Sequence, residues 1–439
     1  MAIRYLEVFL IQIEMSAPIL VYAPEMNERV GKWGVYAIPR MWRASGGELV
    51  IRFNGEADNA DINTLFVLEN LYFVSKDNGD TWTFEPNGEK LYDISVLTGI
   101  DPPYLFLENG ETLFFKYKTN CAPIKNVAFT KDFMHPCGEA MVHSYPYGSI
   151  PDPCKGIDFG RMDSQGNTRY EPICFDFPER EVLVNYIASP NTSFSADVEE
   201  YIQPYIFKSP YMSSLNRLSD GTLVALSTGQ HPQVQDRFCS EVYLIASEDG
   251  GKTWRKRTVV ASDTEKVPFG YGGDGGEVSL AVAEDDSMYC VMRMDMSMHP
   301  EKDETKCWGC RFCASFDKGK SWTAPKEIAD SSVTPHIVAL KNNILIAVYG
   351  RPGVHFKISA DKGETWSDSY SIIGKTLNEE RQAGRADCES KYTDSCSYSN
   401  AFVEKISEDS IIVCYNNLRY PDKNGVNTKA AFVRKITVK

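Results

Sequence analysis

Short runs of alternating apolar and polar residues, separated by turn-forming residues, recur from one end of the chain to the other. Asn-Gly, Asp-Gly and Asn-Asn between two such runs are hairpin signals, because these residues adopt the backbone conformations of tight turns. Six segments have this form: residues 43–52, 107–115, 218–226, 283–292, 340–348 and 406–414. The pattern predicts an all-β protein built on six hairpins.

A second repeat follows four of these hairpins. It is an octet of the form Ser-x-Asp-x-Gly-x-(Thr/Ser)-Trp, at residues 75–82, 247–254, 315–322 and 359–366. The Asp can accept bonds from following backbone N–H groups, the Gly can adopt positive φ, and the Trp can bury its ring against neighbouring strands. We interpret each octet as a structural turn, remote from chemistry, that joins two further strands of the same unit.

Internal repeats of this kind indicate an architecture that grows by adding units. Six units of four antiparallel strands predict a six-bladed β-propeller, which leaves only short and protected sheet edges. We expect one propeller domain over residues 1–439, closed by an N-terminal strand that joins the C-terminal one. Blade two has no octet, and a loop-rich insertion at about 119–181 follows its hairpin. We expect this insertion to replace the second hairpin of blade two with a flap.

The charge and the apolar runs exclude some classes of function. A net charge of −14 argues against nonspecific binding to nucleic acid or to anionic membranes. The N-terminal apolar run is interrupted by Glu7 and Gln12, so it favours a strand over a signal peptide. No stretch reaches the 18 or more apolar residues of a membrane-spanning helix. The expected location is the cytoplasm, unless an export signal is absent from this sequence.

Twelve cysteines raise the question of a metal site. Cys307, Cys310 and Cys313 form the tightest group, but alternation along a strand places the side chains of Cys310 and Cys313 on opposite faces. No second cysteine pair lies at zinc-ribbon spacing. We therefore expect buried thiols, with neither a metal nor a cofactor.

Aligning the six hairpins by their turns shows which residues share one end of the blades. Arg293 and Arg351 occupy equivalent places at the end of the second strand of adjacent blades. Glu277, Tyr398 and Asp101 lie at the start of first strands. Two converging guanidinium groups suit a planar carboxylate or a sulfate. The alternative is that each arginine pairs with a carboxylate of the protein at this rim.

Four features in the same order resemble the sialidase (neuraminidase) superfamily over nearly the whole chain. They are the octets, known there as Asp boxes, Glu277 followed by Arg293, the stretch Tyr349-Gly-Arg351-Pro, and Tyr398-Ser-Asn-Ala-Phe before the last apolar strand. The octets alone are weak evidence of function, since non-enzymatic propellers also carry them. The ordered series of Glu, two Arg and Tyr is more specific.

The resemblance implies a retaining glycoside hydrolase without a cofactor. Tyr398 would attack the anomeric carbon, Glu277 would activate it, and Arg293 and Arg351 would grip the substrate carboxylate. The anomeric carbon of a sialic acid carries a carboxylate, which repels a carboxylate nucleophile but not a neutral phenol. A phenol of pKa about 10 needs a base beside it.

The general acid is expected on the loop after the second strand of blade one. Asp61 fits the spacing of the superfamily best, and Asp58 is the alternative. Proton donation would require closure of the site over the sugar, which raises the pKa of a carboxyl. Asp101, at the inner start of blade two, is a candidate to bond a substrate hydroxyl.

Two positions depart from the superfamily pattern. Ala37, in Tyr-Ala-Ile-Pro, stands where the family has its first arginine, and Asn416 stands where it has the glutamate that orients that arginine. Arg40 is three residues away and starts from the opposite face of a regular strand, so it could substitute only through a bulge. These departures weaken the expectation of strict sialic acid specificity.

The sequence therefore predicts an exo-glycoside hydrolase that releases a terminal acidic sugar from a glycan or glycoconjugate. Sialic acid is the leading substrate. The alternatives are a glycosidase for a different sugar and a catalytically silent carbohydrate-binding propeller. A lyase acting on a uronate is a third possibility.

Overall fold

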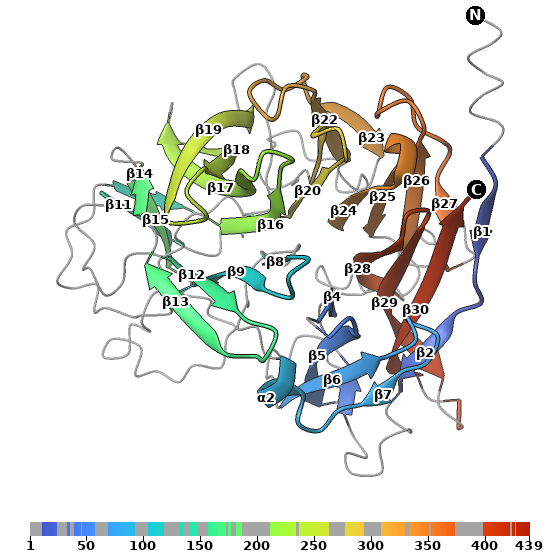
Figure 1. The fold of residues 1–439 in the computed structure, drawn as a ribbon. Helices are drawn as coiled ribbons and strands as arrows, with labels where there is room; N and C mark the ends of the chain where they lie inside the picture. The colour runs from blue at the N-terminus through green and yellow to red at the C-terminus, as the bar shows by residue number, and fades with distance from the viewer. Residues whose placement is uncertain are drawn as a thin grey trace, which may run out of the picture.

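The computed structural model describes residues 11–23, 33–35, 39–44, 46–57, 69–92, 104–117, 131–134, 141–146, 157–172, 174–176, 181–186, 211–233, 237–262, 277–293, 309–329, 333–350, 353–373, 398–421, 424–425 and 427–439. Six small antiparallel sheets are arranged in a ring as the blades of a β-propeller, which confirms the predicted fold (Figure 1). In each blade the first strand lies nearest the centre of the ring and the last strand lies at the outside.

The first three blades have the following strands, in order from the centre outwards. Blade one contains β3 (Trp33–Val35) and β4 (Arg40–Arg43), then β5 (Leu49–Ala57), β6 (Glu69–Ser75) and β7 (Thr83–Phe84), followed by the short helix α2 (Gly88–Tyr92). Blade two contains β8 (Tyr104–Phe106), β9 (Thr112–Tyr117), β12 (Ile157–Met162) and β13 (Thr168–Pro172). Blade three contains β16 (Tyr211–Arg217), β17 (Leu223–Gln233), β18 (Arg237–Ser247), β19 (Thr253–Ser262) and the parallel strand β14 (Cys174–Asp176).

The other three blades have the same order. Blade four contains β20 (Val278–Val282), β21 (Met288–Arg293), β22 (Cys310–Ser315) and β23 (Lys326–Ala329). Blade five contains β24 (Val333–Ala339), the 3-10 turn η6 (Lys341–Asn343), β25 (Leu345–Gly350), β26 (Val354–Ser359) and β27 (Tyr370–Ser371). Blade six contains β28 (Tyr398–Ser407), β29 (Ser410–Pro421), β30 (Asn427–Val438), β1 (Ile13–Met15) and β2 (Ile19–Tyr22).

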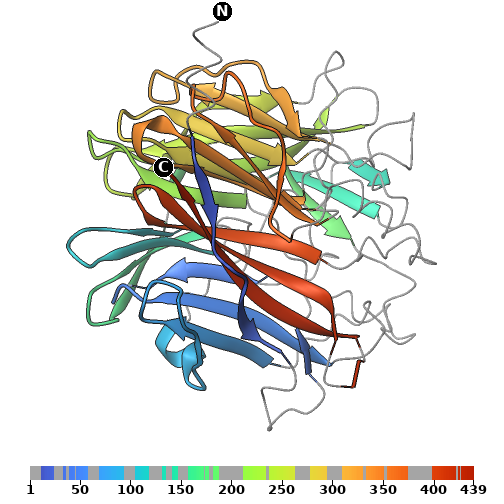
Figure 2. The ribbon, with the colours of Figure 1, turned by 90° about the vertical axis from the view of Figure 1, so that its right-hand side faces the viewer.

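The ring closes by pairing the two ends of the chain. Strands β1 and β2 both pair antiparallel with β30, so blade six takes its outermost strands from the N-terminal region. Figure 2 shows β1 crossing beside the C-terminal strand. This closure agrees with the expectation from the sequence, because strands from both ends of the chain share blade six.

Blade two differs from the sequence-based expectation. Its outer hairpin is present, because β12 pairs with β9 and β13 pairs with β12. The turn between these strands has no octet, but Asp163 takes the same role by accepting the N–H groups of Gln165 and Asn167 at 2.9 Å. The expectation that a flap replaces this hairpin was wrong, since a different Asp turn connects the two strands. The insertion also contains a separate sheet of β10 (Lys131–Met134), β11 (Met141–Pro146) and β15 (Glu181–Tyr186).

The core of the protein lies between blades. A buried apolar cluster separates each blade from the next one around the ring.

Cys310 packs in the cluster shared with blade five, whereas Cys313 packs in the cluster shared with blade three. The two thiols therefore face opposite ways, as strand alternation predicted. Burial raises the pKa of the Cys310 thiol to about 12, so this group stays protonated and inert. No group of three or more metal-ligating side chains occurs among the described residues.

The octets form one rim of the ring, at the turns between strands, which we call the lower rim. In the first octet Asp77 accepts the Thr81 N–H at 2.9 Å, and the Gly79 N–H donates to Ser75 Oγ at 2.7 Å. In the last octet Gly363 has φ of 87°, and an added Cβ would collide with the ring of Phe312 on blade four. The octets thus fix their own turns and also allow close packing against the preceding blade.

Ion pairs along the lower rim connect neighbouring blades. Lys318, in the octet of blade four, lies 2.9 Å from Asp220 in the first turn of blade three. Lys362, in the octet of blade five, lies 2.9 Å from Asp285 in the first turn of blade four. Such exposed pairs contribute little individually. Their regular placement supports a structural role for the octets.

No helix among the described residues is long and apolar enough to cross a membrane.

The octets should also determine how the fold responds to acid. The Thr81 hydroxyl and N–H hold the pKa of Asp77 at about 2, and the Ser321 hydroxyl does the same for Asp317. Because the folded pKa lies below the ordinary value of 3.8, these carboxylates stabilise the fold above pH 4. That contribution should be lost as the pH falls from 4 to about 2. Urea unfolding at several pH values, followed by tryptophan fluorescence, measures the loss.

Asp77→Asn should be less stable than wild type at pH 6 and should show a flatter fall below pH 4. Glu364→Gln is the matched control, because this octet carboxyl makes no hydrogen bond or ion pair within the described part of the chain. Identical acid profiles for wild type and Asp77→Asn would contradict the expectation.

Candidate active site

The candidate site lies at the opposite end of the ring, where each first strand begins and each second strand ends, which we call the upper rim. Glu277 immediately precedes β20 and Arg293 ends β21, so the two residues are backbone neighbours, with the Arg293 N–H bonded to the Glu277 carbonyl at 3.0 Å. Their side chains also meet, and Arg293 Nη1 lies 2.6 Å from Glu277 Oε1. Both side chains are about three-quarters buried. A charge-assisted bond of this length fixes the position of the carboxylate.

The second oxygen of Glu277 is held by the next blade. Glu277 Oε2 accepts the backbone N–H of Thr334 on β24 at 2.8 Å. The hydroxyl of Thr334 in turn accepts the N–H of Ala401 on β28 at 3.3 Å. Side-chain-to-backbone bonds thus connect the first strands of blades four, five and six. Ala401 is three residues after Tyr398, the first residue of β28.

Thr334 can make both bonds because its strand is irregular. The register of β24 on β25 shifts between Val333 and His336, and Thr334 has φ of 46°. A positive φ is strained for a β-branched residue, and such strain is concentrated at functional sites. Ser214 on β16 has the same feature, with φ of 53°, and its hydroxyl accepts the Leu280 N–H of blade four at 3.0 Å. The bulges therefore aim hydroxyl groups at the next blade.

The described residues contain only part of the predicted site. Glu277 and Arg293 are brought together. Tyr398 begins β28, next to the strand that carries Thr334, but its side chain is outside the described part of the structure. Arg351, Asp58, Asp61, Asp101 and Ala37 also lie outside the described residues. Their roles remain predictions.

Two further positions bear on the departures from the superfamily. Asn416 is fully buried on β29 and pairs with Ser399 of β28. Arg40 is half-buried and begins β4, opposite Arg52 of β5. From the pair Val35–Gly55 to the pair Arg40–Arg52, the chain moves on by five residues in β3 and β4. The same step covers only three residues of β5. The register therefore shifts by two residues, which is the kind of irregularity that a substitution by Arg40 requires.

Thr334 and Arg52 were not among the residues predicted for the site. A threonine before a proline in a strand is commonplace, so nothing in the sequence marks Thr334. Arg52 does carry a signal, because it is the one charged residue in the apolar run Leu49-Val-Ile-Arg-Phe53. A charge inside such a run indicates a buried cation that needs an explanation.

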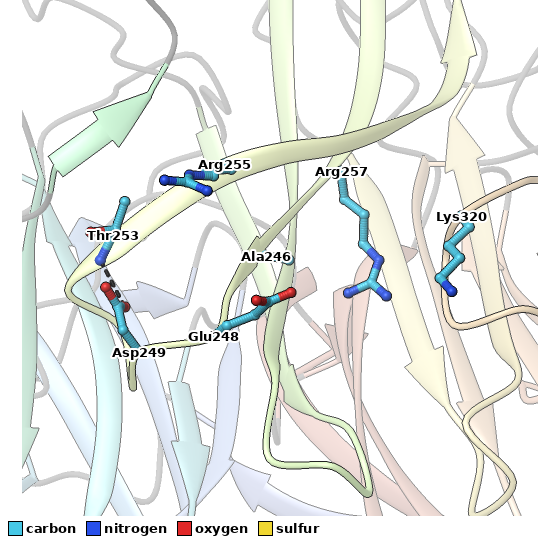
Figure 3. A pocket seen from close by; sticks show the side chains of 7 residues that line it. All are labelled: Ala246, Glu248, Asp249, Thr253, Arg255, Arg257 and Lys320. Atoms are coloured by element: carbon cyan, nitrogen blue, oxygen red, sulfur yellow. Dashed lines mark hydrogen bonds between the residues drawn. The ribbon is translucent and has the colours of Figure 1, made fainter.

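A cavity of about 470 Å³ lies away from this site, between the octets of blades three and four (Figure 3). Its cations are Arg255, Arg257 and Lys320, and its carboxylates are Glu248 and Asp249. Figure 3 shows Arg257 and Glu248 extending towards the same space, while Asp249 bonds the Thr253 N–H within the octet. The cavity is a feature of the lower rim, at the opposite end of the blades from Glu277.

Comparison with known proteins supports the fold of this chain but does not assign it an activity. No family model matches the chain, and no curated protein matches it. A crystal structure of a protein of unknown function from Dyadobacter fermentans is similar over 97% of this chain and 99% of its own, with 18% identity and a TM-score of 0.57. This likeness supports the propeller fold alone.

Two enzymes are more distant structural neighbours. The NanB sialidase from Streptococcus pneumoniae has 12% identity and a TM-score of 0.46, covering 96% of this chain and 70% of that one. The alpha-L-arabinofuranosidase Arb93A from Fusarium graminearum has 14% identity and a TM-score of 0.43, covering 95% and 97%. These neighbours are glycoside hydrolases, but at this distance the likeness carries no argument about activity.

Proposed function

We propose that this protein is a glycoside hydrolase of the sialidase type, which releases a terminal acidic sugar with retention of configuration through an adduct on Tyr398. The observation that carries the proposal is the fixed carboxylate of Glu277 at the upper rim. Both of its oxygens are held, one by Arg293 at 2.6 Å and one by Thr334 at 2.8 Å. The same chain of bonds continues to the strand that begins with Tyr398.

The arrangement suits a base that acts on a phenol. A carboxylate within hydrogen-bond reach of a phenol is a group that can accept its proton. Holding both oxygens removes the freedom of the side chain, so little reorganisation is needed during the reaction. In the proposed reaction Glu277 accepts the Tyr398 proton while the phenolate attacks the anomeric carbon and the bond to the leaving oxygen breaks.

The remaining roles follow from the sequence. Asp61, or Asp58, protonates the leaving oxygen and then activates the water that hydrolyses the adduct. Arg293 and Arg351 grip the acidic group of the sugar, and Asp101 bonds a hydroxyl. Because Arg293 already binds Glu277, it has two tasks, which are to hold the base and to attract the substrate anion. Sialic acid is the substrate that we propose for this hydrolase.

A panel of fluorogenic glycosides tests the proposal. We expect the purified chain to release the fluorophore from an α-sialoside faster than from neutral α- and β-glycosides, and proton NMR should show the α-anomer of the sugar as the first product. If a neutral glycoside were turned over instead, the protein would still be a glycoside hydrolase, but the proposed acidic substrate would be wrong.

The alternatives have distinct readouts in the same experiment. A protein that binds glycans on an array but turns over none of the panel would be a carbohydrate-binding propeller. A product that absorbs near the ultraviolet edge would indicate elimination from a uronate, which is lyase chemistry. Either result would exclude the proposed hydrolysis.

A further inference from the structure

Thr334 connects three blades through two different parts of the same residue. Its backbone N–H donates to Glu277 Oε2 at 2.8 Å, and its hydroxyl accepts the Ala401 N–H at 3.3 Å. The side chain is buried, with an exposed fraction of 1%. Strands β20, β24 and β28 lie side by side around the centre of the ring (Figure 1). Thr334 is therefore the link between the proposed base and the strand that begins with Tyr398.

The bond to Glu277 depends on an irregular backbone. From the pair Val333–Gly350 to the pair His336–Val348, the chain moves on by three residues in β24 but by only two in β25. The extra residue makes a bulge, and φ of Thr334 is 46° within it. In a regular strand a backbone N–H points within its own sheet, whereas this N–H reaches a side chain of blade four.

The irregular conformation has to be held from outside. A β-branched residue at positive φ is strained, and such strain persists only where the surrounding structure fixes it. The Ala401 N–H supplies a fixed point, because it comes from a second irregularity, between Ser399 and Ala401 of β28. A buried N–H without a partner is costly, so its bond to the Thr334 hydroxyl favours the strained conformation.

We infer that Thr334 is a positioning residue for the base. Its strained backbone, held through the hydroxyl by β28, keeps one oxygen of Glu277 fixed relative to the strand that begins with Tyr398. The inference rests on the proposed function for the roles of Glu277 and Tyr398. Thr334 acts through Glu277 and has no contact with the sugar in the proposed reaction.

Ser279 provides a matched control. Its hydroxyl accepts the Ile337 N–H at 3.0 Å, so it also joins the first strands of blades four and five by a buried bond. The register of β20 on β21 is regular through Ser279, which pairs with Val291. Ser279→Ala therefore removes the same kind of bond between blades without affecting a strained backbone.

Steady-state kinetics of the full chain on an α-sialoside gives the first test. Thr334→Ser keeps the hydroxyl and should keep the wild-type kcat. Thr334→Ala loses the hydroxyl and leaves a side chain at a positive φ, so the backbone should relax and withdraw its N–H from Glu277. We expect kcat at saturating substrate to fall about 10- to 100-fold, with a smaller change in KM. Ser279→Ala should keep the wild-type kcat.

Thr334→Gly distinguishes positioning from packing. Glycine also lacks the hydroxyl, but it adopts positive φ without strain, so its N–H should stay directed at Glu277. The kcat of Thr334→Gly should therefore exceed that of Thr334→Ala. A purely structural role predicts the opposite order, because glycine inside a strand is usually more destabilising than alanine.

Urea unfolding gives a second test that needs no turnover. The variants are Thr334→Ala, Glu277→Ala and the double variant. The fall in the urea midpoint caused by Thr334→Ala should be smaller in the Glu277→Ala background than in wild type, because there the N–H has no carboxylate to hold. The corresponding cycle of Ser279→Ala with Glu277→Ala should be additive. If Thr334→Ala failed to fold, Thr334→Val would replace it, since valine keeps the shape and loses the hydroxyl.

Any of four results would overturn the inference. They are a wild-type kcat in Thr334→Ala, an equal loss of kcat in Ser279→Ala, a higher kcat in Thr334→Ala than in Thr334→Gly, and an additive cycle of Thr334 with Glu277. A wild-type chain without sialoside turnover but with a non-additive cycle would reject the proposed hydrolysis and still support the link between Thr334 and Glu277. Normal turnover with an additive cycle would do the reverse.

Discussion

Replacement of Tyr398 by phenylalanine is expected to lower kcat on an α-sialoside by about 10³-fold or more, with the fold and KM little changed. The change deletes one oxygen atom, which is the proposed nucleophile, and keeps the aromatic ring at the start of β28. Without the phenol no adduct can form on this residue, and the chemistry loses its first step. Steady-state kinetics measures the loss, and circular dichroism checks the fold.

Tyr289→Phe is the control for loss of a phenol elsewhere. Burial raises the pKa of Tyr289 to about 12, and its hydroxyl lies 3.4 Å from Asn343 near the lower rim. Activity should be unchanged in this variant. If Tyr398→Phe kept wild-type turnover, the nucleophile would have to be another group, even if the protein were still a hydrolase.

Glu277→Gln is expected to lower kcat by about 10²- to 10³-fold and to reduce stability by about 1–2 kcal/mol. The amide oxygen can still accept the Thr334 N–H, so the link to blade five is retained. The negative charge is lost, and with it both the proposed base and the counter-charge of Arg293, which lies 2.6 Å away. Kinetics and urea unfolding on the same sample separate the two effects.

A double variant distinguishes catalysis from packing. In Glu277→Gln/Arg293→Met the unpaired guanidinium is gone, so much of the lost stability should return while activity stays low. Because Arg293 also grips the substrate anion in the proposal, its loss should raise KM, and the diagnostic quantity is kcat at saturating substrate. Recovery of kcat together with stability would show that Glu277 acts only as a partner of Arg293. In that case the role of base would have to be assigned to another residue.

The site divides into parts that the sequence could predict and parts that it could not. Aligning the hairpins placed Glu277 at the start of a first strand and Arg293 at the end of a second strand, and in the structure Glu277 directly precedes β20 and Arg293 ends β21. Their ion pair was raised only as an alternative, because alignment gives the strand position of a side chain but not the direction in which it turns. Thr334 was missed because its role depends on a bulge, and a bulge has no signature in the residues around it.

Blade two shows the same limit. The octet was a reliable sign of an outer hairpin where it occurred, but its absence did not mean that the hairpin was absent. Asp163 forms a turn with Asn167 that lacks the serine and the tryptophan of the octet. Several turn sequences can connect the same two strands, so a motif identifies some turns without excluding others.

The sequence alone determined the class of fold, the number of blades and the positions of four octets, because alternation and turn chemistry depend on residues only a few positions apart. It also predicted that an N-terminal strand closes the ring on the C-terminal one. Only the tertiary structure decided which side chains meet between blades. The bond from Glu277 to Thr334 spans 57 residues, and the burial of Arg52 depends on how blade one packs against blade two. Such contacts arise when separate hairpins are brought together in the ring, and no local pattern encodes them.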